Sequence, residues 1–108
     1  MIDISYKKGK WILRENYSRD GITIPKGFKT DLASIPRIFW SFYPPFGDYM
    51  NAAIIHDYLY KIKFNRKLSD RIFLMIMKED KVGWFTRTLF YITVRMFGWI
   101  RFNANTSN

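Results

Sequence analysis

Residues 52–60 read Ala-Ala-Ile-Ile-His-Asp-Tyr-Leu-Tyr, an apolar run that holds the single histidine of the chain and, beside it, an aspartate. The apolar residues of this run recur at helical spacings, so the pattern predicts a helix over residues 48–63. Neighbouring residues of a helix point about 100° apart around its axis. His56 and Asp57 can therefore face the rim of one pocket only obliquely.

Two more helices are predicted on either side of this one. Pro36–Phe42 is expected to form a short helix, because a proline is tolerated in the first helical turn. A longer helix begins at Leu68 or Ser69 and ends at Gly83, with Asp70 in its first turn, where a negative charge suits the helix dipole. The apolar face of this longer helix consists of Ile72, Phe73, Ile76 and Met77.

The last predicted helix runs from Trp84 to Gly98. Its large apolar residues step by four and three positions, which predicts a stripe that is buried against the core. The stripe consists of Phe85, Leu89, Ile92, Met96 and Trp99. Arg87 and Arg95 interrupt the segment, and a central arginine costs about 2.5–3.5 kcal/mol on an insertion scale, so insertion across a membrane is not expected.

The first thirty residues are expected to form β-structure. Residues 2–6 alternate in polarity, and a polar turn that contains Gly9 separates them from residues 11–13, which predicts a hairpin. Asp20-Gly21 predicts a second turn, before a further strand at residues 22–24. The chain changes to helices after this region.

The predicted elements define an α+β fold, in which an N-terminal antiparallel β-hairpin or small sheet packs on three to four α-helices. The length of 108 residues suits one domain with one modest core. We expect this domain to cover residues 1–102 and the polar tail at residues 103–108 to be disordered.

Composition restricts the classes of function. The chain has no cysteine, which excludes a disulfide framework, a cysteine metal site and a cysteine nucleophile. The formal net charge is +9, and residues 58–108 carry ten Lys or Arg against three acidic residues. This uneven charge favours nucleic acid, an anionic membrane or an acidic protein as a partner, or serves as a solubilising surface. The first residues do not resemble a secretory signal.

Four short motifs follow one another along the chain. They are P-x-G-F-x-T-D-x-A-S-x-P-R at Pro25 to Arg37, H-D-x-L-Y at His56 to Tyr60, D-R-I-F at Asp70 to Phe73 and V-R-x-F-G at Val94 to Gly98. In this order the motifs resemble the phage and prophage family catalogued as DUF1353, a domain of unknown function. The resemblance implies a bacteriophage or prophage protein, in the bacterial host cytoplasm or in the virion, and it implies little about biochemistry.

The candidate catalytic residues are Asp31, Ser34, His56, Asp57 and Asp70. Ser34 could act as a nucleophile with His56 as its base, or His56 and the carboxylates could bind Mg²⁺ or Mn²⁺, which suit oxygen ligands better than zinc does. The alternative is a buried polar network that fixes the packing of the helices, which is the role that we expect. In either case we predict that Asp31, His56 and Asp70 lie in contact, because the apolar faces around them must meet in one core.

A basic segment joins the predicted helix over residues 48–63 to the next predicted helix, which begins at Leu68 or Ser69. It interleaves charged residues with one aromatic ring. Its candidate binding residues are Lys61, Lys63, Phe64, Arg66 and Lys67. The charges could contact phosphates or a protein partner while the ring stacks on a base. A solvated connector is the alternative interpretation.

Three functions follow from these patterns. The expected one is a non-enzymatic accessory protein that is associated with the virion or binds a host or other protein partner. One alternative is a small phage hydrolase of cell wall or phosphoesters, centred on Asp31, His56 and Asp70. The other is a nucleic-acid-binding protein that uses the basic C-terminal half. No cofactor is expected, apart from a divalent metal in the hydrolase.

Overall fold

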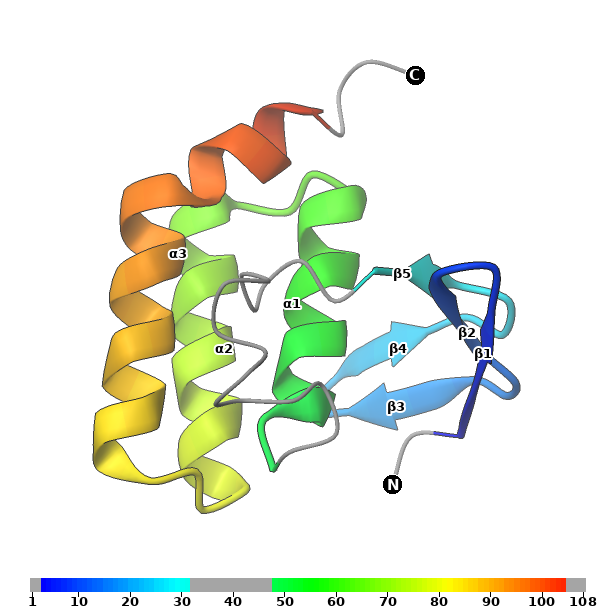
Figure 1. The fold of residues 1–108 in the computed structure, drawn as a ribbon, viewed down its shortest axis with the longest axis horizontal. Coiled ribbons are helices and arrows are strands. Elements are labelled where there is room, and N and C mark those ends of the chain that lie inside the picture. Colours follow the sequence, from blue (N-terminus) through cyan, green and yellow to red (C-terminus); the bar gives the residue numbers. More distant parts are fainter. Residues whose placement is uncertain (1–2, 32–47, 105–108) are drawn as a thin grey trace.

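In the computed structural model of the chain, which describes residues 3–31 and 48–104, five short strands precede three helices (Figure 1). The strands are β1 (Ile4–Lys7), β2 (Lys10–Leu13), β3 (Tyr17–Arg19), β4 (Ile22–Ile24) and β5 (Lys29–Thr30). The helices are α1 (Met50–Lys61), α2 (Arg66–Glu79) and α3 (Trp84–Ala104). The predicted α+β class is confirmed. The predicted helix at Pro36–Phe42 lies outside the described residues.

The strands form two small antiparallel sheets. One sheet has the order β1-β2-β5, and the other pairs β3 with β4. Each hairpin closes through a two-residue turn, at Lys8-Gly9 and at Asp20-Gly21, in which both residues have positive φ. Such turns match the twist of the strands, and glycine adopts a positive φ without a steric penalty. Both turns had been indicated by the sequence pattern.

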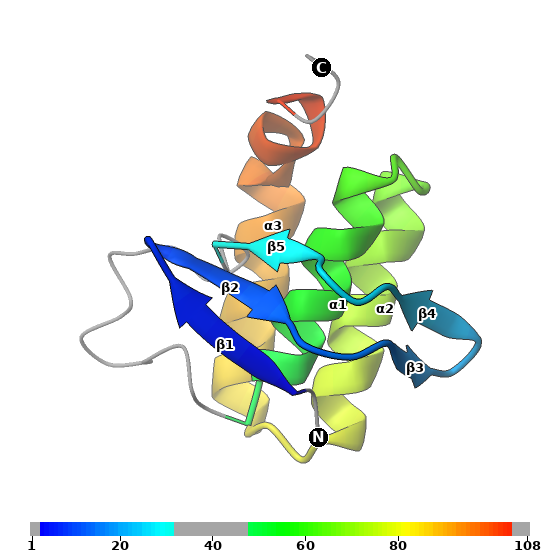
Figure 2. The ribbon, with the colours of Figure 1, turned by 90° about the vertical axis from the view of Figure 1, so that its right-hand side faces the viewer.

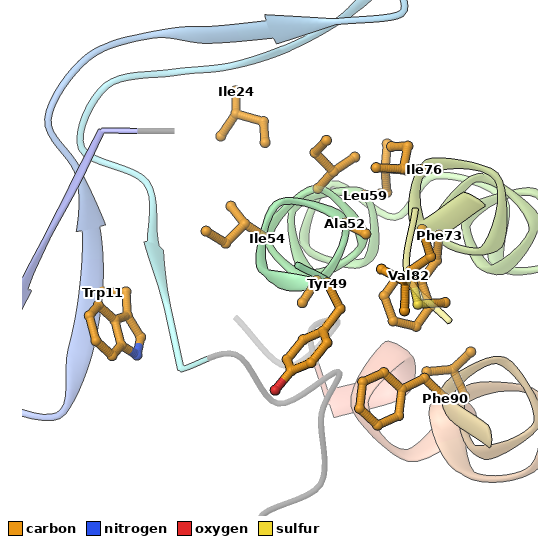
Figure 3. Packing of buried hydrophobic residues seen from close by; sticks show 14 of the residues in the cluster. Trp11, Ile24, Tyr49, Ala52, Ile54, Leu59, Phe73, Ile76, Val82 and Phe90 are labelled. Carbon is orange, nitrogen blue, oxygen red and sulfur yellow. The ribbon is translucent and has the colours of Figure 1, made fainter. Parts of the chain in front are cut away.

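Helix α1 lies at the centre, between the strands and the other two helices (Figures 1 and 2). The buried side chains come from every layer: Trp11, Leu13 and Ile24 from the strands, then Ile54 and Ile55 from α1, followed by Phe73, Ile76 and Met77 from α2 and Phe90 and Val94 from α3. Figure 3 shows Trp11 and Ile24 on one side of α1 and Phe73 and Phe90 on the other. The helix is therefore enclosed by one continuous core.

A separate contact attaches the β3–β4 sheet to the far end of α2. Arg19 donates from both terminal nitrogens to the Asp80 carboxylate, at 3.0 and 2.7 Å, and also to Glu79 at 2.9 Å. These bonds raise the pKa of Arg19 further above its usual value, since they stabilise the charged guanidinium. The small sheet is thus fixed at its tip as well as through its core residues.

The boundaries of α2 differ from the predicted ones. Asn65 caps the helix by accepting a hydrogen bond from the backbone of Leu68 at 3.0 Å, so the helix begins at Arg66, before the predicted start. Asp70 therefore lies in the second turn, beyond the orphan N–H groups of the first turn. The helix ends at Glu79, ahead of Gly83.

The prediction for α3 was wrong in two respects. The helix continues past Gly98 to Ala104, and four of the five residues of the predicted stripe are exposed, while Leu89 is partly buried and packs against the core. Phe85, Ile92, Met96 and Trp99 are 66, 49, 59 and 53% exposed, whereas Phe90 and Val94, on the other side of the helix, are 0 and 5% exposed. Both sides of α3 are apolar, so periodicity alone does not select the buried one. None of the described helices is long and apolar enough to cross a bilayer.

Candidate functional site

Asp70 of α2 is completely buried and accepts hydrogen bonds from side chains of the other two helices, α1 and α3. Its Oδ1 accepts a hydrogen bond from the Tyr60 hydroxyl at 2.5 Å and lies 2.7 Å from His56 Nε2; both residues belong to α1. Its Oδ2 accepts a hydrogen bond from Arg95 Nη1 of α3 at 2.8 Å. Arg66 Nη1 of α2 forms a longer ion pair with the same oxygen, at 3.9 Å. We call Asp70, His56, Tyr60 and Arg95 the Asp70 cluster.

The electrostatics of the cluster fix Asp70 as a carboxylate. Burial alone would raise the pKa of Asp70, but the hydrogen bonds from His56, Tyr60 and Arg95 outweigh it, and the pKa is lowered. An ionised carboxylate only accepts, so His56 Nε2 carries the hydrogen of the shared bond. Burial and the neighbouring carboxylate raise the pKa of Tyr60, which stays a neutral donor. The cluster is suited to joining helices rather than to transferring protons.

Gly98 of α3 completes the environment of this cluster. A methyl group added at Gly98 would overlap the Tyr60 hydroxyl and touch the edge of its ring at 3.4 Å. The absence of a side chain at this position lets α3 approach the tyrosine that binds Asp70. Tyr60, Arg95 and Gly98 were not identified as site residues from the sequence, although each belongs to one of the short motifs.

A second polar cluster lies on the β5 side of α1. Asp57 is 8% exposed and shares a hydrogen bond with the Thr30 side chain. Arg101 Nη2 lies 3.1 Å from Asp31 Oδ1 and 3.9 Å from Asp57 Oδ1, and Lys10 Nζ lies 3.8 Å from Asp31 Oδ2. The structure thus joins His56 to Asp70, as predicted, but places Asp31 with Asp57 and Arg101. Ser34 lies outside the described residues.

The second cluster forms the wall of a cavity of about 140 Å³, which we call the Asp57 pocket. The described residues that line it are Lys10, Lys29, Thr30, Asp31, Asp57, Lys61 and Arg101. Burial raises the pKa of Asp57 above its usual value, and the charge of Asp31 adds to this effect. A carboxyl group that is held against its preferred ionisation inside a pocket is a candidate for ligand binding.

Asp57→Asn tests this placement through the pH dependence of stability. Because folding raises the pKa of Asp57, wild-type stability falls as pH rises from the unfolded value of about 3.9 through the folded pKa. The amide has no such dependence and still accepts from Thr30. Urea unfolding should therefore show the variant at least as stable as wild type at pH 7, within about 1 kcal/mol, and relatively less stable at pH 4. An equal loss at both pH values would contradict the raised pKa.

The metal-binding residues predicted for the hydrolase do not assemble as expected. Among the described residues, no group of three His, Cys, Asp or Glu side chains is arranged to hold an ion. His56 Nε2 is directed at Asp70, and Asp31 is bound to Arg101. A requirement for Mg²⁺ or Mn²⁺ stays a prediction that metal analysis of the purified protein would test.

The basic segment between α1 and α2 divides into partly buried and exposed residues. Lys63 donates to the Phe102 carbonyl and lies over the ring of Phe102, 4.0 Å from its centre, and Arg66 donates to the Arg95 carbonyl at 2.8 Å. These two side chains hold α3 in place. Lys61, Lys67 and Phe64 are exposed, and their proposed contact with a polyanion or a partner stays a prediction.

The fold and the two clusters define a class of small α+β domain, in which a buried aspartate joins three helices beside a charged pocket. Residues 9–94 match the family described as "Protein of unknown function (DUF1353)", and the chain belongs to this family. A curated relative, "Uncharacterized protein y4jT" of Sinorhizobium fredii (strain NBRC 101917 / NGR234), is 38% identical over 73 residues, or 63% of this chain. The chain spans 21% of the length of that relative. No solved structure matches the chain.

Proposed function

We propose that this protein is a non-enzymatic accessory protein of a bacteriophage or prophage, and that it binds a protein component of the virion through α3. The observation that supports this proposal is the exposed apolar stripe of α3, formed by Phe85, Ile92, Met96 and Trp99. We call these four residues the α3 outer face. They lie along one side of the helix over about 21 Å, a length that suits packing against a helix or sheet of another protein.

The chemistry of the α3 outer face indicates the kind of partner. Tryptophan, phenylalanine and methionine are enriched in the buried centres of protein interfaces. The sequence of α3 contains arginines but no acidic residue, and the side chains of Arg95 and Arg101 are 34 and 44% exposed. A partner surface that is apolar at its centre and acidic at its edge would complement this helix.

The Asp70 cluster supports binding rather than catalysis. The single histidine of the chain is 1% exposed and is hydrogen-bonded to Asp70. A general base must reach the proton of a substrate, and a buried histidine that already serves a carboxylate is poorly placed for that. The phage origin rests on the resemblance of the four sequence motifs to those of phage and prophage proteins.

The experiment compares two methionines on different helices. In purified virions of a phage that carries the gene, mass spectrometry should find the wild-type protein at a fixed copy number. Met96→Ser, on the α3 outer face, should reduce that copy number by roughly tenfold, as expected when an interface residue of this type is truncated. Met75→Ser on α2 is the control, since Met75 is also exposed, at 42% against 59% for Met96.

The free energy of unfolding of both variants should lie within about 0.5 kcal/mol of the wild-type value, because both side chains are exposed. Absence of the wild-type protein from virions would overturn the virion partner. Equal copy numbers for Met96→Ser and wild type would show that the α3 outer face is not the binding surface.

A further inference from the structure

We propose that the Asp57 pocket binds a small phosphate monoester that also carries hydroxyl groups, the chemical class to which sugar phosphates belong. This site is separate from the α3 outer face and does not depend on the proposed function. Its lining consists of four cationic side chains, two carboxyl groups and one threonine. These residues belong to β2, β5, α1 and α3, except Asp31, which directly follows β5.

The cations provide a place for a phosphate group. Arg101 and Lys10 are engaged with Asp31, whereas Lys29 and Lys61 form no ion pair with any described residue. These two lysines are exposed and line the same cavity. Lysine binds phosphate as a compact charge with three donors, so two lysines at one pocket suit a doubly charged phosphate monoester.

The acids provide a place for a hydrogen-bond donor. Asp31 is engaged by Arg101 at 3.1 Å, and Asp57 lies deeper, 8% exposed, with its Thr30 partner 2% exposed. A bare phosphate in this cavity would meet the repulsion of the carboxyl groups. A ligand hydroxyl can donate to Asp57 instead, and it keeps the phosphate on the side of the lysines. The pocket should therefore prefer a hydroxylated phosphate over inorganic phosphate.

The size of the cavity limits the ligand. Its volume is about 140 Å³. An enclosed cavity of about 150 Å³ holds one molecule of the size of benzene. One sugar ring or its equivalent fits this space, while a polymer would have to lie across the rim. A nucleic-acid backbone, which would use the same lysines without entering the cavity, is one of the outcomes that the experiment distinguishes.

The test is an NMR titration of the full chain with ribose 5-phosphate, inorganic phosphate and ribose. Ribose 5-phosphate should shift the amide signals of Lys29, Thr30 and Lys61 and bind more tightly than inorganic phosphate or ribose. Lys29→Gln combined with Lys61→Gln should weaken its binding by at least roughly tenfold, which corresponds to about 1.4 kcal/mol. Lys67→Gln, an exposed lysine outside the pocket, is the control for general attraction to a basic protein.

Asp57→Asn tests the binding of the ligand hydroxyl separately from the binding of its phosphate group. The amide keeps the shape of the pocket but weakens the acceptor, so the preference for ribose 5-phosphate over inorganic phosphate should decrease while phosphate binding is retained. Three results would overturn the proposal. They are no shift at these residues with any probe, an equal effect of Lys67→Gln and the double variant, and tighter binding of a single-stranded oligonucleotide that the Asp57→Asn change does not alter.

Discussion

Asp70→Ala should lower the free energy of unfolding by about 3–5 kcal/mol, as expected when one partner of a buried charged group is removed. The substitution leaves the Tyr60 hydroxyl, His56 Nε2 and Arg95 without the carboxylate that all three contact. A small domain is stable by only about 5–15 kcal/mol, so the loss is a large share of the total. Equilibrium urea unfolding, followed by circular dichroism, measures it.

Asp3→Ala is the matched control for this prediction. Asp3 pairs with Arg14 at 3.7 Å, and its side chain is half exposed, so its removal should cost at most about 1 kcal/mol. Folding lowers the pKa of Asp70, so its stabilisation is fully present above the unfolded value of about 3.9 and is lost as the pH falls through the folded pKa. If Asp70→Ala cost no more than Asp3→Ala at neutral pH, the Asp70 cluster would not be what joins the helices.

Gly98→Ala should destabilise the protein, although alanine is the better helix former. The gain in helix propensity is about 1 kcal/mol. Overpacking should cost about 1–3 kcal/mol of stability. A further loss of about 1–3 kcal/mol follows if Tyr60 moves and its buried hydrogen bond to Asp70 is broken. The unfavourable effects are larger, so we expect a net loss of about 2 kcal/mol, measured by urea unfolding.

A double variant identifies the cause of that loss. Tyr60→Phe removes the hydroxyl that a methyl group at Gly98 would overlap, and it leaves the ring in place. Gly98→Ala should therefore cost much less in the Tyr60→Phe background than in the wild type, which a double-mutant cycle measures as a coupling energy. The same cost in both backgrounds would indicate that the methyl group is accommodated without displacing Tyr60.

The elements of the fold were largely readable from the sequence because their signals are local. Gly9 and Gly21 mark the two tight turns, and the apolar face of α2 was predicted from spacing alone. The buried side of α3 was not readable, since an inner side with Phe90 and an outer side with Met96 are both apolar. Contacts between distant parts of the chain decide between them, among them Arg95 with Asp70 and Gly98 with Tyr60.

The candidate site could likewise be predicted only where local sequence signals determine it. His56 and Asp70 are each surrounded by core residues, so their contact follows from the burial of both helices. Asp31 follows β5, and the pairing of β5 with β2 places it on the other side of α1. That pairing is a property of the sheet as a whole, and nothing near Asp31 in the sequence indicates it.

The enclosed position of α1 determines how the protein unfolds. Residues on nearly every side of this helix are buried, among them His56, which faces α2, and Asp57, which faces β5. Such a helix has no side that is suited to water, so it gains little stability until both the strands and the other helices are packed around it. We therefore expect the strands and the helices to unfold together as one cooperative unit, and the amides of α1 to exchange with solvent only through that global unfolding.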